Sequence, residues 1–288
     1  MHPSNRIAVV QFDPQLGKVR ENISKVEALT AQLQPGSVDL LCFPEMAFTG
    51  YCFASFSDIR PFLEDSIDGE TSRFCCSIAK RLRCHVICGY PEKLSGYSES
   101  RQSDDLAANS AILISPEGKL LSNYRKSNLF EFDKPWAEAG NGFTTLDLPA
   151  PLGRTVIAIC MDLNPFPPAE WTSSGGPFEV AEHIRGTNAD TLIFLCNWLD
   201  SGEDPDCEWD TRTLQYWVAR LKPLWDEEYD TDLSTDRVRT VIICNRTGLE
   251  QGVLFAGTSV VFRMSRRDGP EIVGMMKRKT EGARIWTT

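Results

Sequence analysis

Three side chains able to do acid–base and nucleophilic chemistry each follow an apolar segment typical of a β-strand. They are Glu45 after residues 40–44, Lys126 after residues 120–125, and Cys160 after residues 156–159. Ligand sites of sheet-based α/β proteins gather beyond strand ends, where several strands direct side chains into one crevice. A carboxylate, an ammonium and a thiol that meet there would supply the base, the oxyanion partner and the nucleophile of an acyl transfer. Taken singly, each has an ordinary explanation, because a strand-end Cys is usually a core thiol and a strand-end Glu or Lys is usually exposed.

The elements that must position these side chains alternate between strands and helices. Apolar, β-branched segments predict strands at residues 6–12, 38–43, 84–89, 111–114, 119–124, 154–160, 191–195, 238–244, 253–262 and 272–276. Apolar residues three or four apart predict helices at residues 23–33, 71–82, 179–185 and 213–224. This alternation, with a hairpin turn at residues 115–118, predicts a layered α/β fold with mixed sheets. Because no repeat or linker interrupts the chain, we expect a single domain over residues 1–288.

The composition is that of a globular protein with an acidic surface. The 288 residues are 42% hydrophobic, and 30 basic against 40 acidic residues give a net charge of -10. This charge argues against a nucleic-acid or membrane partner, and the basic run 275–279 is too short to change that. No apolar run approaches the roughly 20 residues of a membrane span, and the N-terminal apolar stretch is too short for a signal peptide. We therefore expect an intracellular, cytoplasmic protein with reduced cysteines, and a mitochondrial location stays open.

Other common site chemistries are disfavoured. Several cysteines and a histidine lie within residues 75–88, but they lack the paired spacing of zinc ligands and alternate as a core strand face would. A G-x-S-x-G nucleophile motif and the glycine-rich phosphate-binding motifs are absent from the sequence. We expect neither a metal nor an organic cofactor.

Longer motifs surround the three strand-end residues. They are residues 43–51 (FPEMAFTGY), 124–130 (YRKSNLF) and 159–166 (ICMDLNPF), with further landmarks at residues 8–14, 245–250 and 255–259. In order and spacing these motifs resemble the nitrilase, or carbon–nitrogen hydrolase, superfamily over nearly the whole chain. The resemblance implies one domain with the four-layer α-β-β-α sandwich fold of that superfamily. It also implies a Glu-Lys-Cys site at Glu45, Lys126 and Cys160.

Residue chemistry assigns a role to each member of this implied site. An ammonium near a thiol favours the thiolate, so Cys160 would attack an amide carbonyl. Lys126 and a backbone N–H, that of Met161, would face the developing oxyanion. Glu45 would take the thiol proton, deliver it to departing ammonia and then activate the water that hydrolyses the thioester.

The superfamily often supplies a second acidic residue between the Lys and the Cys. In this chain the candidates are Glu131, Asp133 and Glu138. The local pattern departs from the common one, so the choice stays open. Glu138 is preferred because it directly precedes the segment 139–143 (AGNGF).

Within the superfamily, the chain is most similar to the branch of fungal protein N-terminal amidases. The similarity rests on residues 46–53 (MAFTGYCF), 126–131 (KSNLFE), 160–163 (CMDL) and 197–201 (NWLDS). It implies a hydrolase that deamidates N-terminal Asn or Gln of proteins to Asp or Glu, releases ammonia and feeds the N-degron pathway. Its partners would be protein or peptide N-termini bearing those residues.

An enzyme that recognises a protein N-terminus needs a hydrogen-bond acceptor for the α-ammonium at some distance from the thiol. Asp162, Asp200 and the acidic segment 203–206 are candidates, and Trp198 is a candidate pocket wall. Asp162 also fits a structural acceptor near the Cys turn, which we favour, and Trp198 also fits the core. Each alternative is left open.

Two other functions compete with this interpretation. The first is an amidase of the same superfamily that acts on a small amide, carbamoyl compound or nitrile, and differs only in its pocket loops. The second is a catalytically idle binding module, which the intact Glu-Lys-Cys set argues against. Because superfamily members often self-associate, a homo-oligomer is also possible.

Overall fold

The protein folds around two sheets that each mix parallel and antiparallel strands. The computed structural model describes residues 4–95, 106–204, 206–229 and 236–288. The first sheet has 6 strands in the order β14-β1-β2-β3-β4-β5, and the second has 6 in the order β13-β12-β9-β8-β7-β6.

The first sheet places parallel strands at its centre. Its strands are β1 (Arg6–Gln11), β2 (Leu40–Cys42), β3 (His85–Lys93), β4 (Ala107–Ile114), β5 (Leu120–Arg125) and β14 (Gly282–Thr287). β1, β2 and β3 are parallel, and the other pairings are antiparallel. The long helices α1 (Val19–Thr30) and α3 (Glu70–Leu82) provide the crossovers that parallel neighbours require, while the hairpin of β4 and β5 needs only a short turn.

The second sheet repeats this arrangement. Its strands are β6 (Thr144–Asp147), β7 (Arg154–Ile159), β8 (Thr191–Cys196), β9 (Arg239–Asn245), β12 (Val260–Ser265) and β13 (Gly269–Met275). β7, β8 and β9 are parallel, with α4 (Glu179–Gly186) and α5 (Thr211–Arg220) as crossovers. The hairpin of β10 (Leu249–Glu250) and β11 (Val253–Leu254) is separate from both sheets, and α2 (Phe56–Ile59) is a short surface helix.

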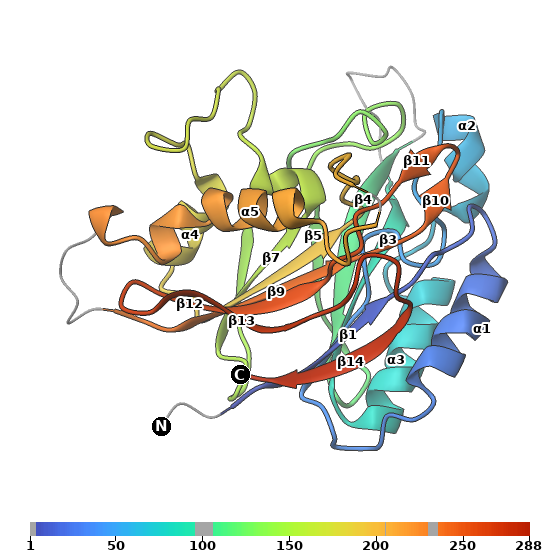
Figure 1. Cartoon of the computed structure of the whole chain (residues 1–288). Coiled ribbons are helices and arrows are strands. Elements are labelled where there is room, and N and C mark those ends of the chain that lie inside the picture. The colour runs from blue at the N-terminus through green and yellow to red at the C-terminus, as the bar shows by residue number, and fades with distance from the viewer. Residues whose placement is uncertain (1–3, 96–105, 205, 230–235) are drawn as a thin grey trace.

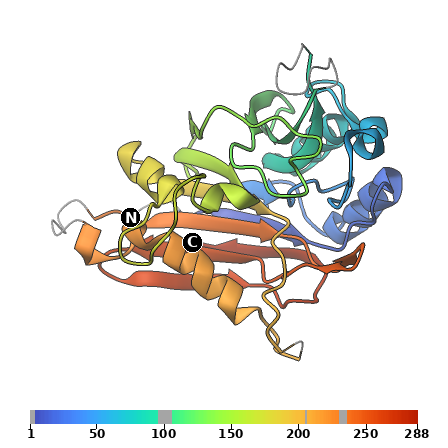
Figure 2. The same cartoon turned by 90° about the horizontal axis from the view of Figure 1, so that it is seen from above.

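Strand alternation decides how the layers stack. On β1, Ile7 and Val9 join the core shared with the second sheet, whereas Ala8 and Val10 join the core beneath α1 and α3. Residues of α4 and α5 pack on the other face of the second sheet. Figure 1 shows α1 and α3 beside the first sheet and α4 and α5 beside the second, and Figure 2 shows the blue α1 and the yellow α4 on opposite sides. These layers confirm the predicted α-β-β-α sandwich.

The sequence analysis did not predict β6 and β14, and the first helix begins and ends before its predicted range. Two further predicted elements are interrupted or end early, each for a backbone reason. The strand expected over residues 253–262 is broken between β11 and β12, because Gly257 and Thr258 take φ values of 56° and 55°, which an extended strand excludes. The helix expected over residues 213–224 ends at Arg220 and is followed by a 3-10 turn that contains Pro223.

No helix in the described ranges is both long and apolar enough to span a membrane. Within the same part of the chain, no group of three or more His, Cys, Asp or Glu side chains is arranged to hold a metal ion.

Candidate active site

The predicted site lies where strands of both sheets end. Glu45 follows β2 and Lys126 follows β5 in the first sheet, while Cys160 follows β7 in the second. The Glu45 Oε1 atom lies 2.7 Å from Lys126 Nζ. Its Oε2 atom accepts a hydrogen bond of 2.6 Å from the backbone N–H of Asn197, just beyond β8. The Glu45 carboxylate therefore connects the two sheets.

Lys126 is held as a buried ammonium. Its side chain is 0% exposed, and its Nζ atom lies 2.7 Å from both Glu45 Oε1 and Asp133 Oδ2. The Tyr51 hydroxyl lies 3.4 Å away. Burial alone would lower the pKa of Lys126, but the charges of Asp133 and Glu45 outweigh it and place that pKa well above its usual range. A thiolate at Cys160 would raise the pKa of Lys126 further.

Glu45 has the environment of a proton-transfer group. Burial raises the pKa of its carboxyl, the nearby Lys126 opposes that rise, and the negative charge of Asp133 adds to it. The Asn109 Nδ2 group donates to both carboxylates, at 2.7 Å to Glu45 Oε1 and 2.9 Å to Asp133 Oδ1. A carboxyl with a raised pKa is better suited than an ordinary glutamate both to accept and to return a proton.

Cys160 sits on a sharp turn between β7 and a 3-10 turn (Cys160–Leu163). Its φ of 42° is unusual for a residue with a side chain, and such strain persists only where neighbouring contacts hold it. Its side chain is only slightly exposed, at 7% for the residue. Met161 is the next residue of the 3-10 turn, and N–H groups in a first helical turn have no intrahelical acceptor. The role of the Met161 N–H toward an oxyanion stays a prediction.

Asp162 holds the Cys160 turn against the segment that carries Lys126. Its Oδ1 atom accepts from the N–H groups of Ser127 and Asn128 at 2.9 and 2.8 Å. Its Oδ2 atom accepts from Ile159 N–H at 2.8 Å and from the Tyr124 hydroxyl at 2.6 Å. Asp162 is 0% exposed, so its oxygens have donors and no access to an external ammonium. These contacts support the structural role that the sequence analysis favoured for Asp162 over its alternative place in the substrate pocket.

Besides Glu45, Asp133 forms an ion pair with Lys126. The second acidic residue at Lys126 is thus one of the three candidates from the sequence, but not Glu138, which the sequence analysis preferred. Asp133 is buried, and its Oδ2 atom also accepts from Tyr51 OH at 3.2 Å and from Phe130 N–H at 2.9 Å. The backbone N–H of Glu138 instead donates to Ala107 O at the start of β4. Sequence spacing did not separate the candidates because residues 127–138 form turns with no period that would assign directions to side chains.

The other predicted pocket residues have partners of their own. Trp198 packs in an aromatic cluster, with ring centroids 5.7 Å from Tyr216 and 5.8 Å from Trp217. The Asp200 carboxylate forms an ion pair with Arg278 and is 8% exposed, so its charge is already balanced. In the segment 203–206, residue 205 lies outside the described residues.

Close backbone packing adds a residue that sequence reasoning missed. Gly89 lies on β3 against the chain that carries Glu45: a Cβ atom there would lie 2.5 Å from Glu45 Cα and 2.7 Å from Met46 N. Only glycine permits this approach, and Met46 itself takes a φ of 48°. No sequence motif marks Gly89, since the neighbour it must admit lies on another strand.

A buried ion pair holds the loop that follows Glu45. The Glu250 Oε1 atom accepts from the N–H groups of Tyr51 and Cys52 at 2.8 and 2.7 Å. Its Oε2 atom lies 2.8 Å from Arg246 NH1, and the Arg246 guanidinium lies over the Phe255 ring at 4.0 Å. Residues of the segments 245–250 and 255–259 thereby support the loop that follows Glu45.

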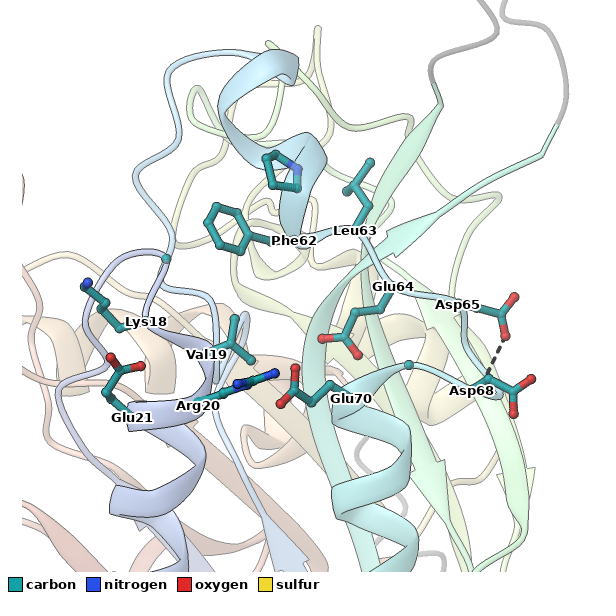
Figure 3. Close-up of a pocket in the computed structure, with 13 residues that line it drawn as sticks. Lys18, Val19, Arg20, Glu21, Phe62, Leu63, Glu64, Asp65, Asp68 and Glu70 are labelled. Carbon is teal, nitrogen blue, oxygen red and sulfur yellow. Dashed lines mark hydrogen bonds between the residues drawn. The ribbon is translucent and has the colours of Figure 1, made fainter.

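A cavity of about 590 Å³ lies elsewhere, between the N-terminal ends of α1 and α3. Figure 3 shows the Glu64 and Glu70 carboxylates close together on one side, with the Arg20 side chain directed toward them from the other. The Glu64 carboxylate is already bonded to Thr71, at 2.7 Å to its N–H and 2.8 Å to its hydroxyl. None of the predicted catalytic residues lines this cavity, so it is separate from the site.

Comparison with known proteins shows the family to which the chain belongs. The family model for carbon-nitrogen hydrolase matches residues 6–165, which include Glu45, Lys126 and Cys160. The chain therefore belongs to the carbon–nitrogen hydrolase family, as the motifs predicted, and is a hydrolase of linear amides.

Two curated proteins and one solved structure show which members of the family are similar to this chain. The chain is 35% identical over 279 residues to the protein N-terminal amidase of Schizosaccharomyces pombe, covering 91% of this chain and 92% of the relative. It is 27% identical to the protein N-terminal amidase of Saccharomyces cerevisiae, covering 69% of this chain and 46% of the relative. A crystal structure of an N-terminal amidase with a Gln-Val peptide superposes with a TM-score of 0.81 at 20% identity and covers 99% of this chain and 98% of its own. At that identity the superposition establishes the fold.

Proposed function

We propose that this protein removes ammonia from the side-chain amide of N-terminal Asn or Gln in proteins and peptides, leaving Asp or Glu. The observation that carries the proposal is the buried Glu45–Lys126–Asp133 array beside Cys160, in a chain 35% identical to a protein N-terminal amidase over 91% of its length. As part of the proposal, residues 1–288 form one catalytic domain. The protein is cytoplasmic, and it forms a homo-oligomer.

The array accounts for the first half-reaction. Glu45 takes the proton of the Cys160 thiol, and the thiolate attacks the carboxamide carbon to form a tetrahedral intermediate. Lys126, kept cationic by its two carboxylates, faces the oxyanion together with the Met161 N–H. Glu45 then returns the proton to the nitrogen as the C–N bond breaks, so that ammonia leaves and a thioester remains.

The same carboxylate completes the cycle. Glu45 removes a proton from water, the hydroxide attacks the thioester carbonyl, and the C–S bond breaks. The product carboxylic acid leaves and the Cys160 thiolate regains its proton. Asp133 and Asn109 keep the Lys126 and Glu45 side chains in position through both steps.

Ammonia release from two matched peptides tests the proposal. One peptide has N-terminal Asn with a free α-amine, the other is the same peptide N-acetylated, and each is assayed with wild type and with Cys160→Ala. We expect Cys160-dependent release from the free-amine peptide alone. Release from neither peptide, with Cys160 still rapidly alkylated, would favour a small-molecule amidase, and an unreactive Cys160 would favour a binding module.

A further inference from the structure

Asn197 is a buried amide with no partner. The residue is 2% exposed, yet within the described residues neither its Oδ1 nor its Nδ2 atom has a hydrogen-bond partner. It is the only buried side chain in that part of the chain to leave two polar atoms unpaired. Buried polar groups in native proteins are nearly always paired, so an exception needs a reason, and a ligand that is bound during function is one.

The backbone of Asn197 places this amide in the active site. Its N–H donates to Glu45 Oε2 at 2.6 Å, and its side chain is attached at Cα, the backbone atom next to that nitrogen. The preceding residue, Cys196, ends β8, which runs parallel to β7 with Leu195 opposite Ile159. The end of β8 therefore lies beside the Cys160 turn, and the Asn197 backbone contacts the carboxylate that protonates the leaving nitrogen.

We propose that the Asn197 Oδ1 atom accepts a hydrogen bond from the NH2 group of the carboxamide that is hydrolysed. The inference deepens the proposed function and rests on it. The substrate carbonyl must face Lys126, so its NH2 group is left toward Glu45 and Asn197. As the C–N bond breaks, this nitrogen gains a proton and positive character, so its hydrogen bond to Asn197 strengthens. The interaction should therefore act more on kcat than on KM.

A substitution that keeps the branched shape of the side chain tests this role. Asn197→Leu has the same branching at Cγ with a somewhat larger volume, keeps the backbone N–H to Glu45 and removes the amide. Because that amide has no partner in the free protein, its removal should leave Tm unchanged or slightly raised. We expect kcat/KM for the free-amine Asn peptide to fall about 10- to 100-fold, mainly through kcat. The rate at which methyl methanethiosulfonate modifies Cys160 should stay the same.

The neighbouring strand offers a matched control. Asn245 lies opposite Cys196 at the end of β9, and its amide is fully paired, with Trp198 N–H at 2.8 Å and Gly257 O at 2.9 Å. Asn245→Leu should therefore lower Tm, whereas Asn197→Leu should not.

Several outcomes would overturn the inference. They are a kcat/KM within twofold of wild type, or an activity loss accompanied by a lower Tm and slower thiol modification. Wild type and Asn197→Leu are also assayed on propionamide, which has a carboxamide but no α-amine. If Asn197→Leu loses activity on the peptide alone, Asn197 binds the α-ammonium instead. If wild type hydrolyses propionamide but no peptide, the proposed function fails while a parallel loss in Asn197→Leu still supports this inference. If wild type hydrolyses neither, both fail.

Discussion

Replacing Asp162 with Asn tests which of two roles this residue has. Asp162 either holds the Cys160 turn in place or binds the substrate. The carboxylate accepts four hydrogen bonds, two at each oxygen, from donors on both sides of the Cys160 turn. An Asn side chain has one oxygen and one NH2 group, so at least one of the backbone N–H groups of Ser127, Asn128 and Ile159 would lose its acceptor and face a donor.

The magnitude follows from these contacts. Hydrogen bonds to charged groups contribute about 1.5–3 kcal/mol each, and a buried donor left unpaired adds its own desolvation cost. We therefore expect Asp162→Asn to lower the free energy of unfolding by about 3–5 kcal/mol, and Tm by roughly 6–15 °C. A thiol displaced by about 1 Å can lose on the order of 100-fold in rate, so kcat should fall about 10- to 100-fold with little change in KM.

The assay combines thermal unfolding with ammonia release from the free-amine Asn peptide. Tyr124→Phe is a graded control because it removes only one of the four donors, the hydroxyl at 2.6 Å, and should cost about 2 kcal/mol. An Asp162→Asn protein with the Tm and kcat of wild type and a raised KM for the free-amine peptide would refute this reasoning. That result would return Asp162 to the substrate pocket.

Three further predictions concern the neighbours of Glu45. Burial and the charge of Asp133 raise the pKa of Glu45, so the acid limb of the pH profile of kcat/KM should lie above the usual pKa range of a glutamate, and activity should be lost as the pH falls through it. Asp133→Asn should move that limb to lower pH. An unshifted limb would contradict the assigned cause. Lys126→Met leaves two buried carboxylates without their cation, so urea unfolding should show a loss of about 3–5 kcal/mol together with loss of activity, and unchanged stability would disprove the pairing. Gly89→Ala places a Cβ atom 2.5 Å from Glu45 Cα, so kcat should fall at least about tenfold, and wild-type kinetics would show that the strands separate freely.

The layers and the three central residues could be predicted from sequence because their signals are local. Alternation along β1 sends Ile7 and Val9 to one core and Ala8 to the other, and such alternation is written into the order of residues. Each of Glu45, Lys126 and Cys160 follows its own strand, so the strand pattern made it a candidate. The motifs around the three residues, in the order and spacing of a known family, then selected them.

Contacts between segments far apart in the chain were decided only by the tertiary structure. Asp133 reaches Lys126 because of how the turns after β5 fold back, which no periodicity encodes. Asp162 is occupied by donors from the other sheet, and Asn197 reaches Glu45 from 152 residues away. Side-chain chemistry and local pattern fix which groups are available, but the packing of the two sheets determines which of them meet, because hydrogen bonds and burial depend on distances that the linear sequence does not contain.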